Sequence, residues 1–201
     1  MRSKIGVLGG TFNPVHFGHL TLAQDALEQF DLDRVLFVPC ARPPHKKPDR
    51  LAPARHRLAM LRAAIRGRKR FGVSSVELDR GGVSYSVDTL RELRRRWPKA
   101  GFYFIIGADT LSELHLWRRI GELLTLCEFV TMRRPGFAFP KGRLGLRNPW
   151  PGRLRANVFK GHLVDVSSSD IRRRVREGRG IRRLVPAAVE RYILGKGLYA
   201  K

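Results

Sequence analysis

The sequence predicts an α/β fold, a Rossmann-like, doubly wound and mostly parallel sheet with helices on both faces. Three observations favour this fold. Short apolar runs rich in β-branched residues alternate with segments of helical spacing. Two of these runs end in glycine, as strands do where a parallel strand leads into a helix. Hydrophobic residues make up 43% of the 201 residues, enough for a core. We therefore expect one domain over 1–201, with a C-terminal helical part from about residue 167.

The first half of the chain supplies three predicted strands and three predicted helices. Strands are expected at 4–8, 34–38 and 73–78, the first ended by a glycine pair and the second by a proline. Helices are expected from about residue 18 to 30, around 58–65 and over 86–97, where apolar residues recur at helical spacing. A proline-rich polar loop at 42–48 separates the second strand from the second helix.

The second half continues the alternation. The run 102–106 is the most strand-like in the chain, and further strands are expected at 128–132 and 163–166. Helices are expected over 109–124, from the cluster Ser167 to Asp170 and over 186–194, the last with proline in its first turn. The stretch 134–157 is rich in Pro, Gly and Arg and lacks periodicity, so we interpret it as a long surface loop.

Charge is the unusual feature of the composition. Lys and Arg number 40 against 17 Asp and Glu, a formal net charge of +23. Such a balance attracts polyanions, but the basic residues are spread over many predicted helices and no stacking aromatics are interleaved with them. We interpret the charge as a solvated, arginine-biased surface and expect no specific nucleic-acid partner.

The apolar segments and the cysteines indicate the location and the redox state of the protein. No apolar run is long enough to span a bilayer, and the N-terminal run 5–8 is too short for a signal peptide. We expect a cytoplasmic protein with no membrane partner, and a homo-oligomer is compatible with the sequence. Cys40 and Cys127 lie in apolar surroundings and are expected to be buried, reduced thiols.

The junction after the first strand has the features of a phosphate site. Gly9-Gly10 allows a ligand to approach the backbone closely, and the helix that follows directs its free N–H groups to the same place. His16 and His19 share a face of the first helical turn. A Walker loop and a dinucleotide-binding glycine fingerprint are both absent, and no third ligand adjoins the histidines to favour zinc. Capping or packing is the alternative role for such a histidine pair.

At two junctions the sequence resembles the nucleotidylyltransferase superfamily. The segment 10–19 is similar to its Gly-Thr-Phe-Asp-Pro and His-x-Gly-His signature, and Ser167 to Arg172 is similar to its Ser-Ser-Thr-x-Ile-Arg motif near the C-terminus. Asn13 stands where the superfamily has Asp, which argues against an obligatory carboxylate there. Within the superfamily the chain resembles the nicotinate-nucleotide adenylyltransferases through 43–46, 82–90, Gly107-Ala108-Asp109, Trp117 and 133–136. Only about 137–157 is unmatched.

The resemblance implies adenylyl transfer from ATP to nicotinate mononucleotide, which gives deamido-NAD and pyrophosphate in NAD biosynthesis. It assigns catalytic roles to His16, His19, Lys46 and Arg172. It assigns ATP binding to Gly9, Gly10, Thr11, Phe12, His16, His19, Gly107, Asp109, Ser167, Ser168 and Arg172. It assigns nicotinate-nucleotide binding to His45, Lys46, Ser86, Trp117 and Arg118. Mg²⁺ is expected on the ATP phosphates, with no protein-made metal site.

Plainer roles and other functions stay open at this point. Asp109 could cap its helix, Trp117 could anchor the core, and the serine cluster could be an ordinary helix cap. Another nucleotidylyltransferase, acting on nicotinamide mononucleotide or phosphopantetheine, is the nearest alternative, and the run 84–89 with Trp117 favours nicotinate mononucleotide. An RNA-binding module or a tRNA-synthetase-like core is the alternative from a different class. The chain has no RNP-type aromatic motif and is short for a synthetase.

Overall fold

A computed structural model describes residues 2–44, 51–133, 144–162 and 164–200. Six strands form one sheet in the order β3-β2-β1-β4-β5-β6. The pairs β1–β4, β4–β5 and β5–β6 are parallel, with Val7 opposite Phe104 and Ile105 opposite Val130. This is the strand order of a doubly wound α/β fold, so the predicted fold class is confirmed.

The chain groups into two compact units, which we describe separately. The described residues of Met1–Leu8, Leu22–Leu36 and Tyr85–Leu163 form the first unit, and those of Gly9–Thr21, Phe37–Ser84 and Val164–Lys201 form the second. Strand β1 (Lys4–Gly10), helix α1 (Phe17–Gln29) and strand β2 (Arg34–Pro39) contribute residues to both. The expectation of a single domain stays a prediction.

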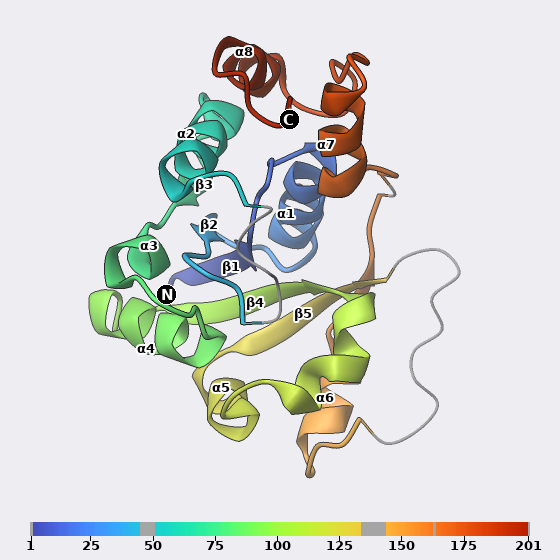
Figure 1. The fold of residues 1–201 in the computed structure, drawn as a ribbon. Coiled ribbons are helices and arrows are strands. Elements are labelled where there is room, and N and C mark those ends of the chain that lie inside the picture. Colours follow the sequence, from blue (N-terminus) through green and yellow to red (C-terminus); the bar gives the residue numbers. More distant parts are fainter. Residues whose placement is uncertain (1, 45–50, 134–143, 163, 201) are drawn as a thin grey trace. The chain divides into compact units, whose positions relative to one another are not determined.

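The first unit is built on the longest strands (Figure 1). It contains α4 (Ser86–Arg96), β4 (Gly101–Gly107), the 3₁₀ segment η2 (Ala108–Leu116), α5 (Ile120–Leu126), β5 (Glu128–Arg133), α6 (Trp150–Ala156) and β6 (Val158–Lys160). Helix α4 packs beside α5, while α5, η2 and α6 contact β5. β4 and β5 are buried along most of their length, as the continuous apolar runs in their sequences predict.

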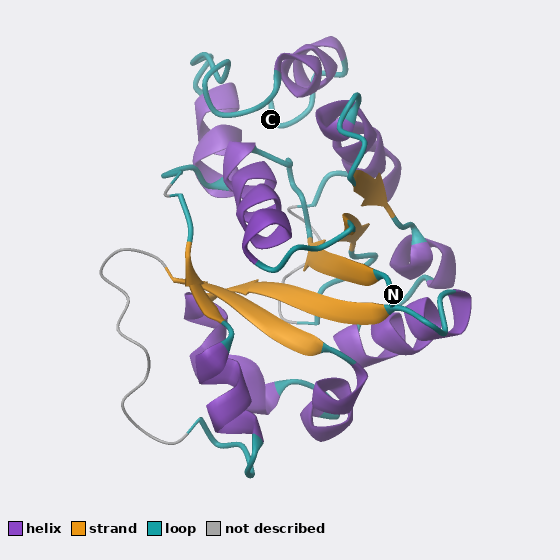
Figure 2. Cartoon of the chain, turned by 180° about the vertical axis from the view of Figure 1, so that it is seen from behind, coloured by secondary structure: helices purple, strands orange, loops and turns teal. Residues whose placement is uncertain are grey.

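The second unit is mainly helical and ends the chain. Its elements are α2 (Ala54–Ile65), β3 (Phe71–Val73), α3 (Val76–Arg80), α7 (Ser168–Arg176) and α8 (Ala187–Gly195). Helix α2 packs against α8, and the two lie side by side when the molecule is viewed from the front and from behind (Figures 1 and 2). Met60 and Leu61 of α2 and Val189 and Ile193 of α8 are buried.

Four sequence predictions are wrong in detail. In the run 73–78 only Val73 belongs to a strand, β3, and residues from Val76 onward belong to helix α3, whose N-cap residue is Ser75. The helix expected over 109–124 is divided, because η2 ends before Trp117 and Arg119 has a positive φ of 52°. The loop expected up to residue 157 contains α6, whose first turn accommodates proline. The last strand is Val158–Lys160, since that segment pairs with β5, and 164–166 is irregular.

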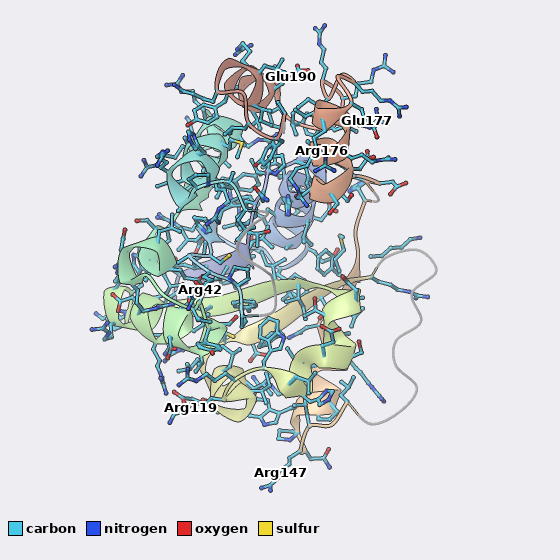
Figure 3. All side chains as sticks on the ribbon, in the orientation of Figure 1. Arg42, Arg119, Arg147, Arg176, Glu177 and Glu190 are labelled. Atoms are coloured by element: carbon cyan, nitrogen blue, oxygen red, sulfur yellow. The ribbon has the colours of Figure 1, made fainter. Side chains whose placement is uncertain are left out.

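The arginine-rich surface is distributed along the chain. The exposed Arg42, Arg119, Arg147 and Arg176 come from four different segments (Figure 3). Some of the acidic groups pair with arginines: Arg91 makes two hydrogen bonds to the Glu122 carboxylate, of 2.6 and 2.7 Å. The Arg91 hydrogen bond lowers the pKa of Glu122.

Candidate active site

A buried loop follows β1 and carries the first histidine motif. Phe12 has a positive φ of 47° and its side chain is fully buried. The Phe12 ring packs edge-on against His19, with the ring centroids 5.0 Å apart. A β-carbon on Gly10 would lie 3.3 Å from the Phe12 ring, so glycine lets the strand end close beneath this aromatic side chain. The loop 11–16 is thereby folded back onto the first turn of α1.

His16 and His19 lie against each other at the start of α1. Their ring centroids are 3.7 Å apart, and His16 is buried. The backbone N–H of His16 donates to Nδ1 of His19 at 3.3 Å. Because Nδ1 accepts, the neutral His19 ring carries its proton on Nε2. The second ring nitrogen of His19 is therefore a donor, as binding of a phosphate oxygen requires.

Gly18 separates the two histidines for a steric reason. A β-carbon at this position would lie 3.1 Å from Nδ1 and 3.2 Å from Cε1 of His16. The His16 ring therefore rests directly on the helix backbone, in space that any other residue would occupy. The glycine of the His-x-Gly-His motif thus sets the position of the first histidine.

The second motif begins helix α7 and holds the histidine loop. The Ser167 side chain caps the helix by accepting from the backbone N–H of Asp170 at 3.1 Å. Ser168 Oγ donates to the Pro14 carbonyl at 2.9 Å, and Arg172 Nη1 donates to the Asn13 carbonyl at 2.8 Å. The structure therefore brings the two sequence motifs together within the second unit, although they lie at opposite ends of the chain.

Arg57 of α2 is a cation that the sequence did not single out. It is 1% exposed, and its guanidinium donates to four carbonyl oxygens. Nη1 bonds Thr11 O at 2.9 Å and Cys40 O at 2.8 Å, Nε bonds Ala52 O at 2.9 Å, and Nη2 bonds Ala41 O at 3.3 Å. The histidine loop and two further loops of the second unit are joined through this one side chain. Arg57 lies just before the helix predicted around 58–65, and no local pattern signalled this role.

The Asn13 side chain also has a structural task. Its Oδ1 accepts from the backbone N–H of Ala52 at 3.0 Å and from the Tyr199 hydroxyl at 2.8 Å. Asn13 is 2% exposed, so these bonds are made out of contact with water. A neutral amide oxygen meets the demand of both donors, which gives a physical reason why the superfamily's Asp can be replaced here.

The first unit contains the glycine and aspartate that follow β4. Gly107 is the N-cap residue of η2, with no side-chain cap. The carboxylate of Asp109 extends back over Gly107. It lies so close that a β-carbon on residue 107 would collide with Oδ1 of Asp109. Asp109 is exposed and lies in the first turn of η2. An exposed carboxylate at the end of a parallel strand is suited to accept hydrogen bonds from ligand hydroxyl groups.

The candidates for the pyridine nucleotide also lie in the first unit. Ser86 is the first residue of α4, and Tyr85 is its N-cap residue. The Arg118 guanidinium lies over the Tyr85 ring, 4.5 Å from its centroid, a cation–π contact that holds the charge near the start of α4. Trp117 packs edge-on against Phe104 and Phe129, with centroids 5.8 and 6.2 Å away. Tyr85, which makes this cation–π contact, was not singled out from the sequence, although it stands inside the run 84–89.

Four further findings concern the remaining candidate residues, metal ligands, the cysteines and membrane-spanning helices. His45 and Lys46 lie outside the described residues. Within the described ranges, no three His, Cys, Asp or Glu side chains cluster as metal ligands. Both cysteines are free and buried, as expected, and burial raises the pKa of Cys127 to about 12. No helix in the described part of the chain is long and apolar enough to cross a membrane.

Comparison with known proteins identifies the family. Residues 7–174 match the model of the family described as cytidylyltransferase-like. A probable nicotinate-nucleotide adenylyltransferase of Opitutus terrae is 47% identical over 98% of this chain and 97% of its own. One of Halalkalibacterium halodurans is 45% identical over 98% of this chain and 91% of its own.

Solved structures agree in fold at much lower identity. A Plasmodium falciparum nicotinic acid mononucleotide adenylyltransferase complexed with NaAD superposes with a TM-score of 0.77 at 17% identity, over 98% of each chain. A putative nicotinate-nucleotide adenylyltransferase from Vibrio parahaemolyticus gives 0.71 at 19% identity, over 99% of this chain and 96% of that one. With identities above 40% over almost the full length of its relatives, this chain belongs to the cytidylyltransferase-like family and, within it, to the nicotinate-nucleotide adenylyltransferases.

Proposed function

We propose that this protein transfers the adenylyl group of ATP to nicotinate mononucleotide, releasing pyrophosphate and forming deamido-NAD for NAD biosynthesis. The observation that carries the proposal is the pair His16 and His19, in ring contact at the N-terminus of α1 on a loop held by Ser168 and Arg172. Such a site offers ring N–H groups and helix amides to a polyphosphate. The names of the relatives that cover nearly the whole chain support the same reaction.

The chemistry asks for alignment and charge stabilisation. A 5′-phosphate oxygen of nicotinate mononucleotide attacks the α-phosphorus of ATP in line, the new P–O bond forms, and the bond to the pyrophosphate oxygen breaks. The nucleophile is already ionised at neutral pH, so no general base is needed. Negative charge grows on the departing pyrophosphate, where the Nε2–H of His19 can donate a hydrogen bond. The gain comes from holding both nucleotides in line.

The remaining ATP contacts are proposed residue by residue. ATP would approach the backbone closely at Gly9, Gly10, Thr11 and Phe12. The carboxylate of Asp109, which follows Gly107, would accept hydrogen bonds from the ribose hydroxyls. Ser167, Ser168 and Arg172 would face the β- and γ-phosphates, with Arg172 also holding Asn13. Lys46 is proposed to steady the transferring phosphate, and it lies outside the described residues.

The pyridine end is proposed to lie at the start of α4. The Ser86 hydroxyl and the helix amides donate hydrogen bonds, which are stronger to a carboxylate than to a carboxamide. The Arg118 guanidinium, held over Tyr85, adds a positive charge and favours nicotinate further. Trp117 would border this end, and His45, which lies outside the described residues, would contribute to it. We therefore propose preference for the acid over the amide.

Mg²⁺ is proposed to act on ATP rather than on a protein-made cage. Phosphate oxygens would supply most of its ligands, because Mg²⁺ is usually bound through substrate phosphates with only one or two protein carboxylates. When bound, the ion would neutralise charge on the phosphates and so make pyrophosphate a better leaving group. The cytoplasmic location and the absence of a specific nucleic-acid partner stay predictions.

Pyrophosphate release tests the proposal directly. The purified chain is assayed with ATP and Mg²⁺ against nicotinate mononucleotide, nicotinamide mononucleotide and phosphopantetheine, with identification of the dinucleotide product. We expect turnover with nicotinate mononucleotide, much less with the amide and none with phosphopantetheine. Equal turnover with the acid and the amide would refute the acceptor assignment. RNA binding that falls steeply with salt, without pyrophosphate release, would favour the nucleic-acid alternative.

A further inference from the structure

Tyr199, four residues after the end of α8, reaches the histidine loop. The Tyr199 hydroxyl donates to Oδ1 of Asn13 at 2.8 Å, across 186 residues of sequence. The same oxygen accepts from the backbone N–H of Ala52 at 3.0 Å. A backbone N–H can only donate, so the shared atom is the amide oxygen rather than the nitrogen. Both of its lone pairs are therefore used.

Tyr199 is held in place by the turn that ends α8. The N–H of Gly197 bonds Leu194 O at 3.1 Å and that of Leu198 bonds Ile193 O at 3.0 Å. Gly197 and Tyr199 both have positive φ values, 57° and 67°. A tyrosine in this left-handed region is uncommon, so the tertiary contact of its side chain repays a local conformational cost.

The Tyr199 hydroxyl is a stable donor. Burial raises its pKa, and the opposing attraction of Arg172 and Arg57 is smaller. The phenol therefore keeps its proton through the pH range in which the enzyme would work. Asn13 is almost wholly buried, so loss of the hydroxyl would leave one lone pair of its amide oxygen without a donor.

The loop that Asn13 belongs to leads to His16 and His19. Its main chain is held by Arg57 at Thr11 O, by Arg172 at Asn13 O and by Ser168 at Pro14 O. The Asn13 side chain is a further attachment, and Tyr199 supplies one of its two donors. Small displacements of a substrate-aligning group can lower rates far more than they lower stability.

We propose that Tyr199 is a positioning residue for ATP: through Asn13 it fixes the loop that presents His16 and His19. The inference rests on the proposed function for its kinetic consequence. The effect of Tyr199 on the order of the loop does not depend on that function and can be measured without turnover.

The test compares two hydroxyl deletions in the same unit. Tyr199→Phe removes the bond to Asn13, whereas Tyr192→Phe removes a bond of 2.9 Å to Nδ1 of His56 and leaves Asn13 untouched. We expect kcat/KM for ATP to fall about threefold to tenfold in Tyr199→Phe, the worth of one hydrogen bond to a buried acceptor. The KM for nicotinate mononucleotide should stay within about twofold. Tyr192→Phe should keep both constants at their wild-type values. Its Tm should fall by about as much as the Tm of Tyr199→Phe.

A double-mutant cycle shows whether Tyr199 acts through Asn13. Asn13→Leu removes the acceptor, so adding Tyr199→Phe to it should lower kcat/KM for ATP no further. Fully multiplicative losses would overturn the proposal, as would equal ATP defects in Tyr199→Phe and Tyr192→Phe. Near-ultraviolet circular dichroism establishes that each variant is folded.

Hydrogen exchange separates this inference from the proposed function. The amides of 11–19 should exchange faster in Tyr199→Phe than in the wild type, and at the wild-type rate in Tyr192→Phe. This measurement needs no turnover. A wild type without pyrophosphate release would reject the function alone, whereas unchanged exchange in Tyr199→Phe would reject the positioning role alone.

Discussion

The backbone N–H of His16 donates to Nδ1 of His19 at 3.3 Å, and the two imidazole rings lie 3.7 Å apart. This bond fixes which nitrogen of His19 carries the proton in the neutral ring. It also ties the His19 ring to the backbone at His16, so that a movement of this backbone moves the ring. The Phe12 ring, 5.0 Å from that of His19, supports it on another side.

His19→Ala removes the proposed donor to the departing pyrophosphate. We expect kcat/KM to fall by a factor of about 10² or more, or about 2.7 kcal/mol of transition-state stabilisation, because such donors act where charge develops. Steady-state pyrophosphate release measures it, with the melting temperature as a folding control. Turnover near that of the wild type would exclude His19 from catalysis.

Gly18→Ala tests the contact between the helix backbone and His16. The new methyl group would lie 3.1 Å from Nδ1 of His16 and displace the ring, so kcat/KM for ATP should fall about tenfold or more. Folding should suffer little, since alanine favours the helix. Gly121→Ala in α5, with nothing within 4 Å of the added carbon, is the matched control and should keep full activity. An active Gly18→Ala enzyme would mean that the His16 ring has room to move.

Ser86→Ala removes a hydroxyl proposed to bind the pyridine nucleotide. We expect a higher KM for nicotinate mononucleotide with little change in KM for ATP, because only one substrate loses a hydrogen bond. Ser75→Ala, which removes a hydroxyl at the N-terminus of α3, should leave both KM values unchanged. The two KM values are obtained by varying one substrate at saturation of the other. A defect confined to ATP would show that the two half-sites are assigned the wrong way round.

Arg57→Met would leave four carbonyl oxygens without their donor. We expect the free energy of unfolding to fall by about 3 kcal/mol, since buried acceptors lose their partner and cannot regain water. Denaturant titration measures the change. Arg62→Met on an exposed position of the same helix is the control and should change stability by less than about 0.5 kcal/mol. Equal effects of the two substitutions would contradict the role given to Arg57.

Cys127 links stability to alkaline pH. Burial raises the pKa of its thiol from 9.0 to about 12, whereas an unfolded chain would restore the ordinary value. The neutral thiol therefore stabilises the fold below pH 9, and this contribution is lost as pH rises from about 9 to 12. Unfolding of the wild type and Cys127→Ala across this range isolates the effect, because the other titrating groups are shared. A constant stability difference between the two would disprove it.

The sequence predicted the central strands well because buried parallel strands are continuous apolar runs. The strands 4–8, 34–38, 102–106 and 128–132 all appear, each within two residues of its expected ends. The edges of the sheet were predicted poorly. β3 and β6 have three residues each, too few for a period to be recognised. Helix α6 was not recognised because Pro149 is its N-cap residue and its first turn contains Pro151 and Gly152. At these places pairing partners decide the structure.

The sequence by itself determined the two motifs, their helix starts and the family to which they belong, because each signal lies in a few consecutive residues. Only the tertiary structure decided what holds the histidine loop. Arg57 and Tyr199 have no local pattern that marks them, and the bonds they make to Thr11 and Asn13 join residues 46 and 186 positions apart. The role of the Asn13 side chain depends on its two donors, the backbone N–H of Ala52 and the hydroxyl of Tyr199. A buried acceptor is satisfied by whichever donor folding brings to it, and that donor cannot be recognised from the neighbouring sequence.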